Sequence, residues 1–411
     1  MNAHNSLLYP KLCRLAIIFY LGLIMIHQLK KVFTDLFHTE PFLFRSPGRI
    51  NIIGEHTDYN QGFVLPAAIE QAAYIAIDIR NDDTIHLFAR SLNESAELNL
   101  HNLEPVNGAW SNYIAGVVQQ FIEKGYSIKG FNMVLDSDLP IGAGLSSSAA
   151  IECAVAYALN ELFQCKLDRL QLVHMAQKAE HEFAGVQCGI MDQFASMMST
   201  RNNLIKLDCR SLEYEYIPFQ LEGYSLVLFD TNVKHSLASS AYNERRQQCE
   251  QGVKLVSEQV SGISSLRDVS MDQLKQYVLP NDPLVYKRCA YVVEEIERVE
   301  NACKALQAGN IRELGKLMYA THTGLSQDYA VSCKELDLLV DLVKLNPAVI
   351  GARMMGGGFG GCTINLVETS AVSSLIEDIK KSYELAMHLP LHYYVVSTAD
   401  GSSGINNQPV S

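Results

Sequence analysis

The pattern of apolar and polar positions changes repeatedly between the periods of strands and helices, without internal repeats or low-complexity tracts. Apolar residues dominate 42–53 and 62–80, on either side of a polar loop, and this pattern predicts strands in both segments. Residues 131–135 predict a shorter strand, and 113–124 has the apolar spacing of a helix. The first half of the chain therefore mixes the two kinds of element.

Two capping patterns mark further helix starts. Asp168 and Gln171 form a D-x-x-Q pair that opens one predicted helix. Ser332 and Glu335 form an S-x-x-E box that opens another, predicted over 332–345. In both patterns the first side chain accepts a hydrogen bond from a backbone N–H that the helix leaves unpaired, and so fixes where the helix begins.

A second block of elements begins near Tyr224 and contains a clear helical pattern over 287–307. We therefore place the boundary between the two halves within 211–223. This division predicts one domain over 25–215 and a second domain over 216–411.

Composition narrows the class of protein. With 411 residues, of which 48% are hydrophobic and 19% charged, the chain can bury the cores of two globular domains. A net charge of −12 argues against a nucleic-acid surface and leaves any phosphate binding local. Ten cysteines without C-x-x-C pairs argue against a zinc site or a disulfide framework, and favour reduced, mostly buried thiols in a cytosolic protein.

The N-terminus carries an uncharged apolar run over 15–26. It is shorter than a bilayer span, which needs about 20 residues, although a short interfacial or signal-anchor role stays open. We expect translation to begin at Met25, so that residues 1–24 are an apolar extension absent from the natural protein and dispensable for its activity. After this start, an amphipathic helix is predicted by the spacing of Ile26, Leu29, Val32, Phe33, Leu36 and Phe37.

The stretch PIGAGLSSSAAIECAVAYAL, residues 140–159, joins a glycine- and serine-rich loop to a segment with the composition of a buried helix. Gly142 and Gly144 allow a tight turn and close approach of a ligand to the backbone. The loop brings backbone N–H groups to a helix N-terminus, whose natural ligand is an anion such as phosphate. The serine hydroxyls add donors, and one could bind a magnesium ion. A simple turn with a serine N-cap is the alternative.

Several known phosphate-binding classes are excluded. No lysine follows either glycine of the loop as a Walker A motif requires, and the H-R-D and D-F-G motifs of protein kinases are missing. A G-x-G-x-x-G pattern occurs at Gly356, Gly358 and Gly361, but 362–367 has the pattern of a strand where a Rossmann site needs a helix. Its alternative interpretation is a tight connection between strands.

The stretch PGRINIIGEHTDYNQG contains Arg49 and then four consecutive polar residues, Glu55, His56, Thr57 and Asp58. Carboxylates that alternate with imidazole and hydroxyl groups suit the several hydroxyls of a sugar. A solvated turn is the alternative interpretation of such a polar run.

Two further carboxylates lie in the segment AEHEFAGVQCGIMDQFASMM. Glu180 is placed on a predicted helix, and Asp192 follows a glycine-containing loop in apolar surroundings. Because burial of an unpaired charge is costly, Asp192 is either a helix cap or a functional carboxylate.

Taken together, three stretches identify a resemblance. PGRINIIGEHTDYNQGFVLP looks like the signature of galactokinases, and PIGAGLSSSAA and MMGGGFGGCTINLV resemble the phosphate-loop and C-terminal glycine motifs of the wider GHMP family of small-molecule kinases. The resemblance extends from about Glu40 to about Ala399, without a departure at the positions that carry the chemistry.

The resemblance implies an α+β fold of two domains, the N-terminal one ribosomal protein S5 domain 2-like and the C-terminal one ferredoxin-like, with the active site in the cleft between them. It implies phosphorylation of D-galactose at C1 by ATP with Mg²⁺, the first committed step of galactose catabolism, in a cytoplasmic protein expected to be a monomer. No nucleic-acid partner is expected, and no membrane partner apart from the N-terminal extension. A catalytically weak sugar-sensing homologue and an N-acetylgalactosamine kinase are the alternatives.

The resemblance also implies a role for each matching residue. Asp192 matches the catalytic base, and Arg49 the cation that would keep it ionised and stabilise the transferring phosphoryl group. The residues that would bind galactose are Glu55, His56, Thr57, Asp58, Gly189 and Tyr242. Those that would hold the ATP phosphates are Gly142, Ala143, Gly144, Leu145, Ser146, Ser147 and Ser148. The residues that would bind Mg²⁺ are Ser148 and Glu180.

Overall fold

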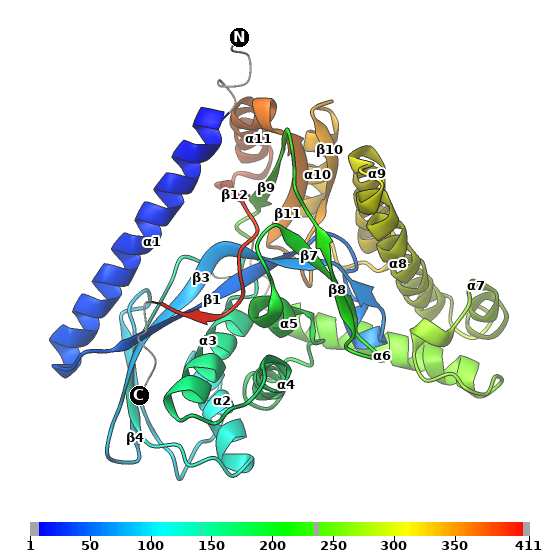
Figure 1. Ribbon diagram of the computed structural model, residues 1–411. Coiled ribbons are helices and arrows are strands. Elements are labelled where there is room, and N and C mark those ends of the chain that lie inside the picture. Colours follow the sequence, from blue (N-terminus) through cyan, green and yellow to red (C-terminus); the bar gives the residue numbers. More distant parts are fainter. Residues whose placement is uncertain (1–7, 141, 234–237, 406–411) are drawn as a thin grey trace.

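Figure 1 presents the fold as a computed structural model that describes residues 8–140, 142–233 and 238–405. A six-stranded sheet organises the N-terminal half, with strand order β13-β1-β3-β6-β4-β5. Neighbouring strands are antiparallel except β4 and β6, which pair in parallel. The strands are β1 Phe42–Asn51, β3 Pro66–Ile79, β4 Thr84–Ala89, β5 Glu94–Asn99, β6 Phe131–Ser137 and β13 Ser403–Gly404.

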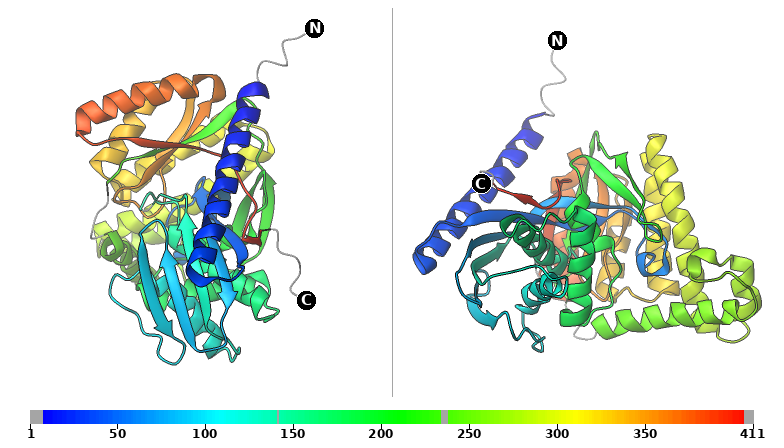
Figure 2. Two further views of the ribbon diagram at one scale, coloured as in Figure 1. Left: turned by 90° about the vertical axis from the view of Figure 1, so that its left-hand side faces the viewer. Right: turned by 60° about the horizontal axis from the view of Figure 1, so that its bottom comes forward.

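The two faces of this sheet follow from the alternation of side chains along β3. Ile75 and Ile77 point into the main core, where α3 packs on β1 and β3. Tyr74 and Ala76, one position out of phase, form a separate small core with α1 on the opposite face. In Figure 2, α1 lies along the outside of the molecule against this sheet. The helices of this half are α1 Leu8–Phe37, α2 Asn112–Glu123, α3 Ser147–Leu162, α4 Arg169–Ala179 and α5 Met191–Met198.

A four-stranded antiparallel sheet of order β10-β11-β9-β12 organises the C-terminal half, at the top of Figure 1. Along β9, Val227 and Phe229 point into a core with α10 and α11, whereas Leu226 and Leu228 point into the main core. These elements are β9 Tyr224–Asp230, β10 Val349–Met354, β11 Cys362–Glu368, β12 His392–Val396, α10 Lys334–Lys344 and α11 Val372–Met387.

The two halves are joined by more than a linker. A three-stranded sheet and the helices α6 to α9 lie to the right in Figure 1. After β12 the chain returns to the N-terminal sheet, where β13 pairs with β1 and Thr398 bridges Ile69. The predicted boundary within 211–223 stays a prediction. The remaining elements are β2 Phe63–Val64, β7 Asn203–Asp208, β8 Tyr214–Pro218, α6 Ala238–Ser257, α7 Met271–Gln273, α8 Pro283–Gln307 and α9 Ile311–Thr323.

Most elements predicted from the apolar pattern are present, and one capping prediction is wrong. The reciprocal hydrogen bonds between Asp168 and Gln171 are formed at the start of α4. The helix predicted from Ser332 begins only at Lys334, with Cys333 at the N-cap and no side-chain cap. Ser332 Oγ donates instead to Asp337 Oδ1 at 2.5 Å, because a charged acceptor lies within reach on the same helix.

The helix predicted from Met25 belongs to α1, which begins earlier, at Leu8. Leu29 and Phe33 are fully buried, as its amphipathic spacing predicts, but Leu36 is 47% exposed because the sheet covers only one side of the helix. Residues 1–7 lie outside the described part, and the fold does not test where translation begins. No helix within the described ranges is long and apolar enough to cross a membrane.

Candidate active site

A cavity of about 130 Å³ lies where the two halves meet. Three parts of the chain form its walls. They are the end of β1 with the polar loop that follows it, the segment from the end of α4 to the start of α5, and, in the C-terminal half, α6 and the loop between β10 and β11. The lining residues are Arg49, Glu55, His56, Asp58, Glu180, Val186, Cys188, Gly189, Met191, Asp192, Tyr242, Gly356 and Gly357.

Asp192 and Arg49 form a bidentate ion pair at one wall of this cavity. Arg49 Nε donates to Asp192 Oδ1 at 2.7 Å and Nη2 to Oδ2 at 2.8 Å, while Nη1 donates to the carbonyl oxygen of Gly144 in the phosphate loop. Burial lowers the pKa of Arg49, but Asp192 and Glu55 offset this effect and the net shift is upward, so the guanidinium stays charged. The pair therefore presents a carboxylate held in one orientation.

Ser146 completes the environment of this carboxylate. It occupies the N-cap position of α3 in a left-handed conformation with φ of 58°, and its side chain makes no capping hydrogen bond. Its hydroxyl donates to Asp192 Oδ2 instead. Ser146 is thus the N-cap residue by position, as the alternative interpretation of the loop predicts, but its hydroxyl does not cap the helix.

Asp58 approaches Asp192 across the cavity. Burial, followed by the charge of Asp192, raises the pKa of Asp58 to about 7. A Cβ on Gly189 would lie 1.8 Å from Asp58 Oδ2, so only glycine leaves room for this carboxyl group. These contacts explain why the chain has a glycine three residues before Asp192.

His56 lines the cavity with a buried, neutral ring. Its Nδ1 lies 2.8 Å from the hydroxyl of Tyr59, whereas its buried Nε2 has no hydrogen-bond partner among the described residues. Burial lowers the pKa of His56 to about 3, so the ring is neutral near pH 7. The Tyr242 ring packs 5.3 Å from the imidazole, centroid to centroid.

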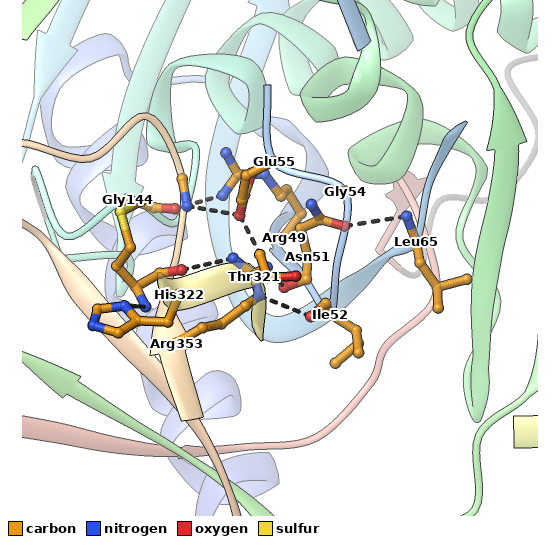
Figure 3. Close-up of polar contacts among 12 residues, drawn as sticks. Arg49, Asn51, Ile52, Gly54, Glu55, Leu65, Gly144, Thr321, His322 and Arg353 are labelled. Atoms are coloured by element: carbon orange, nitrogen blue, oxygen red, sulfur yellow. Dashed lines mark hydrogen bonds and ion pairs between the residues drawn. The ribbon is translucent and has the colours of Figure 1, made fainter. Parts of the chain in front are cut away.

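Glu55 is held by the C-terminal half through a residue that the sequence did not single out. Arg353 on β10 is fully buried, and its Nη2 lies 3.0 Å from Glu55 Oε1, which also accepts from Gly356 N at 2.8 Å. Figure 3 shows the same guanidinium donating to the carbonyl oxygens at the end of β1. The sequence signal that could have identified Arg353 is its position as a lone charged residue in an apolar run just before the glycine motif.

The structure does not bring Thr57 to the cavity, although the sequence placed it among the sugar ligands. Thr57 is fully buried, and its Oγ1 lies 2.9 Å from the carbonyl oxygen of Gly54 and 2.6 Å from that of Phe63. Its hydroxyl therefore closes the loop rather than facing a ligand.

The predicted phosphate loop, residues 140–148, leads from β6 into the first turn of α3, and all of it except residue 141 is described. The C-terminal glycine run packs against it, since a Cβ on Gly356 would lie 3.4 Å from the carbonyl oxygen of Gly144. Ala143 and Leu145 are buried, so these two residues offer backbone groups rather than side chains. The two glycine-rich motifs thus form one wall of the site.

Ser148 and Glu180 meet beside this loop. Ser148 lies on α3, and Glu180 begins the π-helical turn Glu180–Ala184 that follows α4. Ser148 Oγ donates to Glu180 Oε1 at 2.9 Å. Burial, followed by the charge of Asp192, raises the pKa of Glu180. A hydroxyl and a carboxylate are hard oxygen donors, so the chemistry of this pair would fit a magnesium ion.

Comparison with known proteins assigns the chain to a family. Residues 31–79 match the galactokinase galactose-binding signature, 112–200 match the GHMP kinases N terminal domain, and 302–385 match the GHMP kinases C terminal domain. A galactokinase of Thermotoga neapolitana is 43% identical over 357 residues, which are 87% of this chain and 98% of that protein. The chain belongs to the galactokinase family. A galactokinase of Fusobacterium nucleatum is 40% identical and is matched along 100% of its length.

Solved structures agree with this assignment to the galactokinase family. The structure of Lactococcus lactis galactokinase complexed with galactose is similar with a TM-score of 0.89 at 36% identity, and the match covers 93% of this chain and 100% of that one. Mevalonate kinase of Methanococcus jannaschii, at 18% identity and a TM-score of 0.65, shares the fold. The predicted two-domain GHMP kinase fold is therefore confirmed.

Proposed function

We propose that this chain transfers the γ-phosphoryl group of ATP to the C1 hydroxyl of D-galactose. The observation that carries the proposal is the Asp192–Arg49 pair, because Arg49 contacts both Asp192 and the phosphate loop at the wall of the cavity. The galactose-binding signature and the similarity to a galactose-complexed galactokinase support the sugar. A kinase requires this juxtaposition of an acceptor pocket and a phosphate loop.

Asp192 is suited to accept the proton of the sugar hydroxyl as it attacks the γ-phosphorus. Its carboxylate is oriented by Arg49 and Ser146, and it remains partly exposed, with a side-chain exposure of 25%. Positioned proton acceptors contribute about 10²- to 10⁴-fold to a rate. Arg49, which also contacts the phosphate loop, would stabilise the charge on the transferring group.

The sugar would lie among residues from both halves of the chain. Glu55 and Asp58 offer carboxylate oxygens, and His56, Gly189 and Tyr242 shape the wall. Thr57 is not included, because its hydroxyl is bonded within the loop. Such a set of oriented polar groups in a small cavity can distinguish the hydroxyl pattern of one hexose from another.

The nucleotide would bind along 142–148, where backbone N–H groups and serine hydroxyls meet the N-terminus of α3. Ser148 and Glu180 would hold Mg²⁺, which supplies charge neutralisation to the phosphates when it is bound. A cation would also relieve the cost of burying the Glu180 carboxylate. A cytoplasmic location and a monomeric state remain predictions from the sequence.

The first test is substrate choice. With Mg-ATP, release of ADP is expected to be most efficient with D-galactose, compared with N-acetylgalactosamine, glucose and mevalonate. A coupled assay that reports kcat/KM for the four substrates measures this directly. A higher value for N-acetylgalactosamine would favour the alternative kinase activity, and no turnover with any substrate, despite galactose binding, would favour a sugar sensor.

A second expected result concerns pH. Because the pKa of Asp58 is about 7 in the free protein, this carboxyl is protonated below about pH 6 and ionised above about pH 8. The ionised form accepts stronger, charge-assisted hydrogen bonds from hydroxyl groups, so galactose binding should release a proton. The affinity for galactose should therefore rise with pH through this window.

Calorimetric titration of galactose at several pH values measures the effect, and D58N provides the control. The amide does not titrate, so the transition should disappear in D58N. His56 remains neutral throughout the window, because its pKa is about 3. An equal pH dependence in D58N would show that another group causes it.

A further inference from the structure

Both oxygens of the Glu180 carboxylate accept hydrogen bonds inside the protein. Oε1 accepts from Ser148 Oγ at 2.9 Å. Oε2 accepts from Gln193 Nε2 at 2.6 Å and from Cys188 Sγ at 3.4 Å. The shortest of these contacts comes from Gln193, a residue to which neither the sequence motifs nor the cavity lining assigns a role.

Gln193 directly follows Asp192 in the first turn of α5 and is fully buried. Successive residues of a helix point about 100° apart, so Asp192 faces the cavity while Gln193 faces the interior. Its Nε2 also lies 3.2 Å from Glu152 Oε2 on α3. Because a side-chain amide has two N–H donors, one nitrogen can serve both carboxylates.

Glu152 is a second unassigned polar residue in this interior. It is fully buried, and it lies one helical turn after Ser148, on the same side of α3. Its neighbours Cys153 and Ala154 belong to the apolar core. Among the described residues, Glu152 Oε1 and Gln193 Oε1 have no hydrogen-bond partner. A buried carboxyl and amide that are only partly satisfied cost stability, so packing alone does not explain them.

We propose that Gln193 is a positioning residue for Glu180, and that Glu152 fixes the orientation of the Gln193 amide. The amide holds Glu180 Oε2, which keeps Oε1 directed at Ser148, where Mg²⁺ is proposed to bind. The inference rests on the proposed function, because it takes Glu180 as a metal ligand. Since Asp192 precedes Gln193 on the same turn, α5 also keeps the proposed base and the metal ligand in a fixed relation.

The test compares Mg²⁺ affinity in matched variants. Q193M keeps an unbranched side chain of similar length but removes both donors. It is expected to weaken Mg²⁺ binding to the enzyme saturated with a non-hydrolysable ATP analogue by about 10- to 100-fold, as for other partners of metal ligands. Calorimetric titration of Mg²⁺ measures this without turnover. Binding of the metal-free analogue and of galactose should not change.

Two substitutions at Glu152 test whether this residue fixes the orientation of the Gln193 amide. E152Q keeps an oxygen that can accept from the Gln193 amide and should retain the Mg²⁺ affinity, whereas E152M should lose it as Q193M does. M197L, at a fully buried position of α5 outside this network, controls for repacking of the helix. Should Q193M fail to fold, Q193N supplies an amide too short to reach both carboxylates.

Two results would overturn the inference. The first is a folded Q193M or Q193N, judged by thermal unfolding, with the Mg²⁺ affinity of the unchanged protein. The second is an equal loss of Mg²⁺ affinity in E152Q and E152M. E180A distinguishes a wrong role for Gln193 from a wrong assignment of the metal ligand. If E180A loses Mg²⁺ affinity but the Gln193 variants keep it, only the role of Gln193 is rejected. Unchanged affinity in E180A rejects Glu180 as a ligand, while the substrate assay still tests the kinase activity.

Discussion

D192N is expected to lower kcat by about 10²- to 10⁴-fold, because the amide keeps the shape of the carboxylate but cannot accept the proton of the sugar hydroxyl. Binding of galactose and of ATP should change little, since neither substrate depends on that proton transfer to bind. Steady-state kinetics give kcat, and calorimetric titration gives the two dissociation constants.

D192N also changes the hydrogen bonds that the side chain at this position can accept. Its two oxygens accept three hydrogen bonds, two from Arg49 and one from Ser146, and an amide can accept on one side only. D168N, at the exposed N-cap of α4, is the matched control, because asparagine caps helices as well as aspartate. A kcat for D192N equal to that of D168N would remove Asp192 from the role of base.

R353M is expected to have the largest effect on stability. The guanidinium is fully buried and pairs with Glu55, and removal of one partner from a buried ion pair costs about 3–5 kcal/mol. The substitution also leaves the carbonyl oxygens of Asn51 and Ile52 without their donor. Urea-induced unfolding measures the loss, and galactose affinity should fall with it, because Glu55 lines the cavity that is proposed to bind the sugar.

An exposed ion pair provides the control for R353M. Lys178 and Glu123 lie 2.8 Å apart with side-chain exposures of 49% and 41%, so K178M should cost less than about 1 kcal/mol. The double variant R353M/E55Q should recover part of the stability lost in R353M, because it no longer buries an unpaired charge. Equal losses of unfolding free energy in R353M and K178M would contradict the importance of the buried ion pair for stability.

Sequence patterns predicted the parts of the site that lie within one continuous segment. The polar loop at Glu55, His56 and Asp58 and the turn before α3 are local, so their composition and spacing indicate them directly. Their roles in binding and catalysis stay predictions, which the variants above would test. The sequence predicted one helix start incorrectly. The hydroxyl of Ser332, which the capping box was expected to use, donates to the carboxylate of Asp337 instead.

The missed residues act across long separations in the sequence. Arg353 contacts Glu55 over 298 positions, and Gln193 contacts Glu152 over 41. The periodicity of apolar residues does not predict such pairs, because each pair depends on how two separate elements pack. Thr57 shows the opposite error: its place in a polar run suggested a ligand, but the tight loop requires its hydroxyl for backbone carbonyl groups.

The pairing of β13 with β1 has a consequence for the order in which the protein is built on the ribosome. β1 is synthesised long before Ser403–Gly404, so this edge of β1 has no partner strand until β13 follows. Open strand edges invite pairing with other chains. The edge of β1 at Phe44 and Arg45 is therefore closed only after Ser403–Gly404 has been synthesised, which makes the completion of this sheet a late step in the folding of the chain.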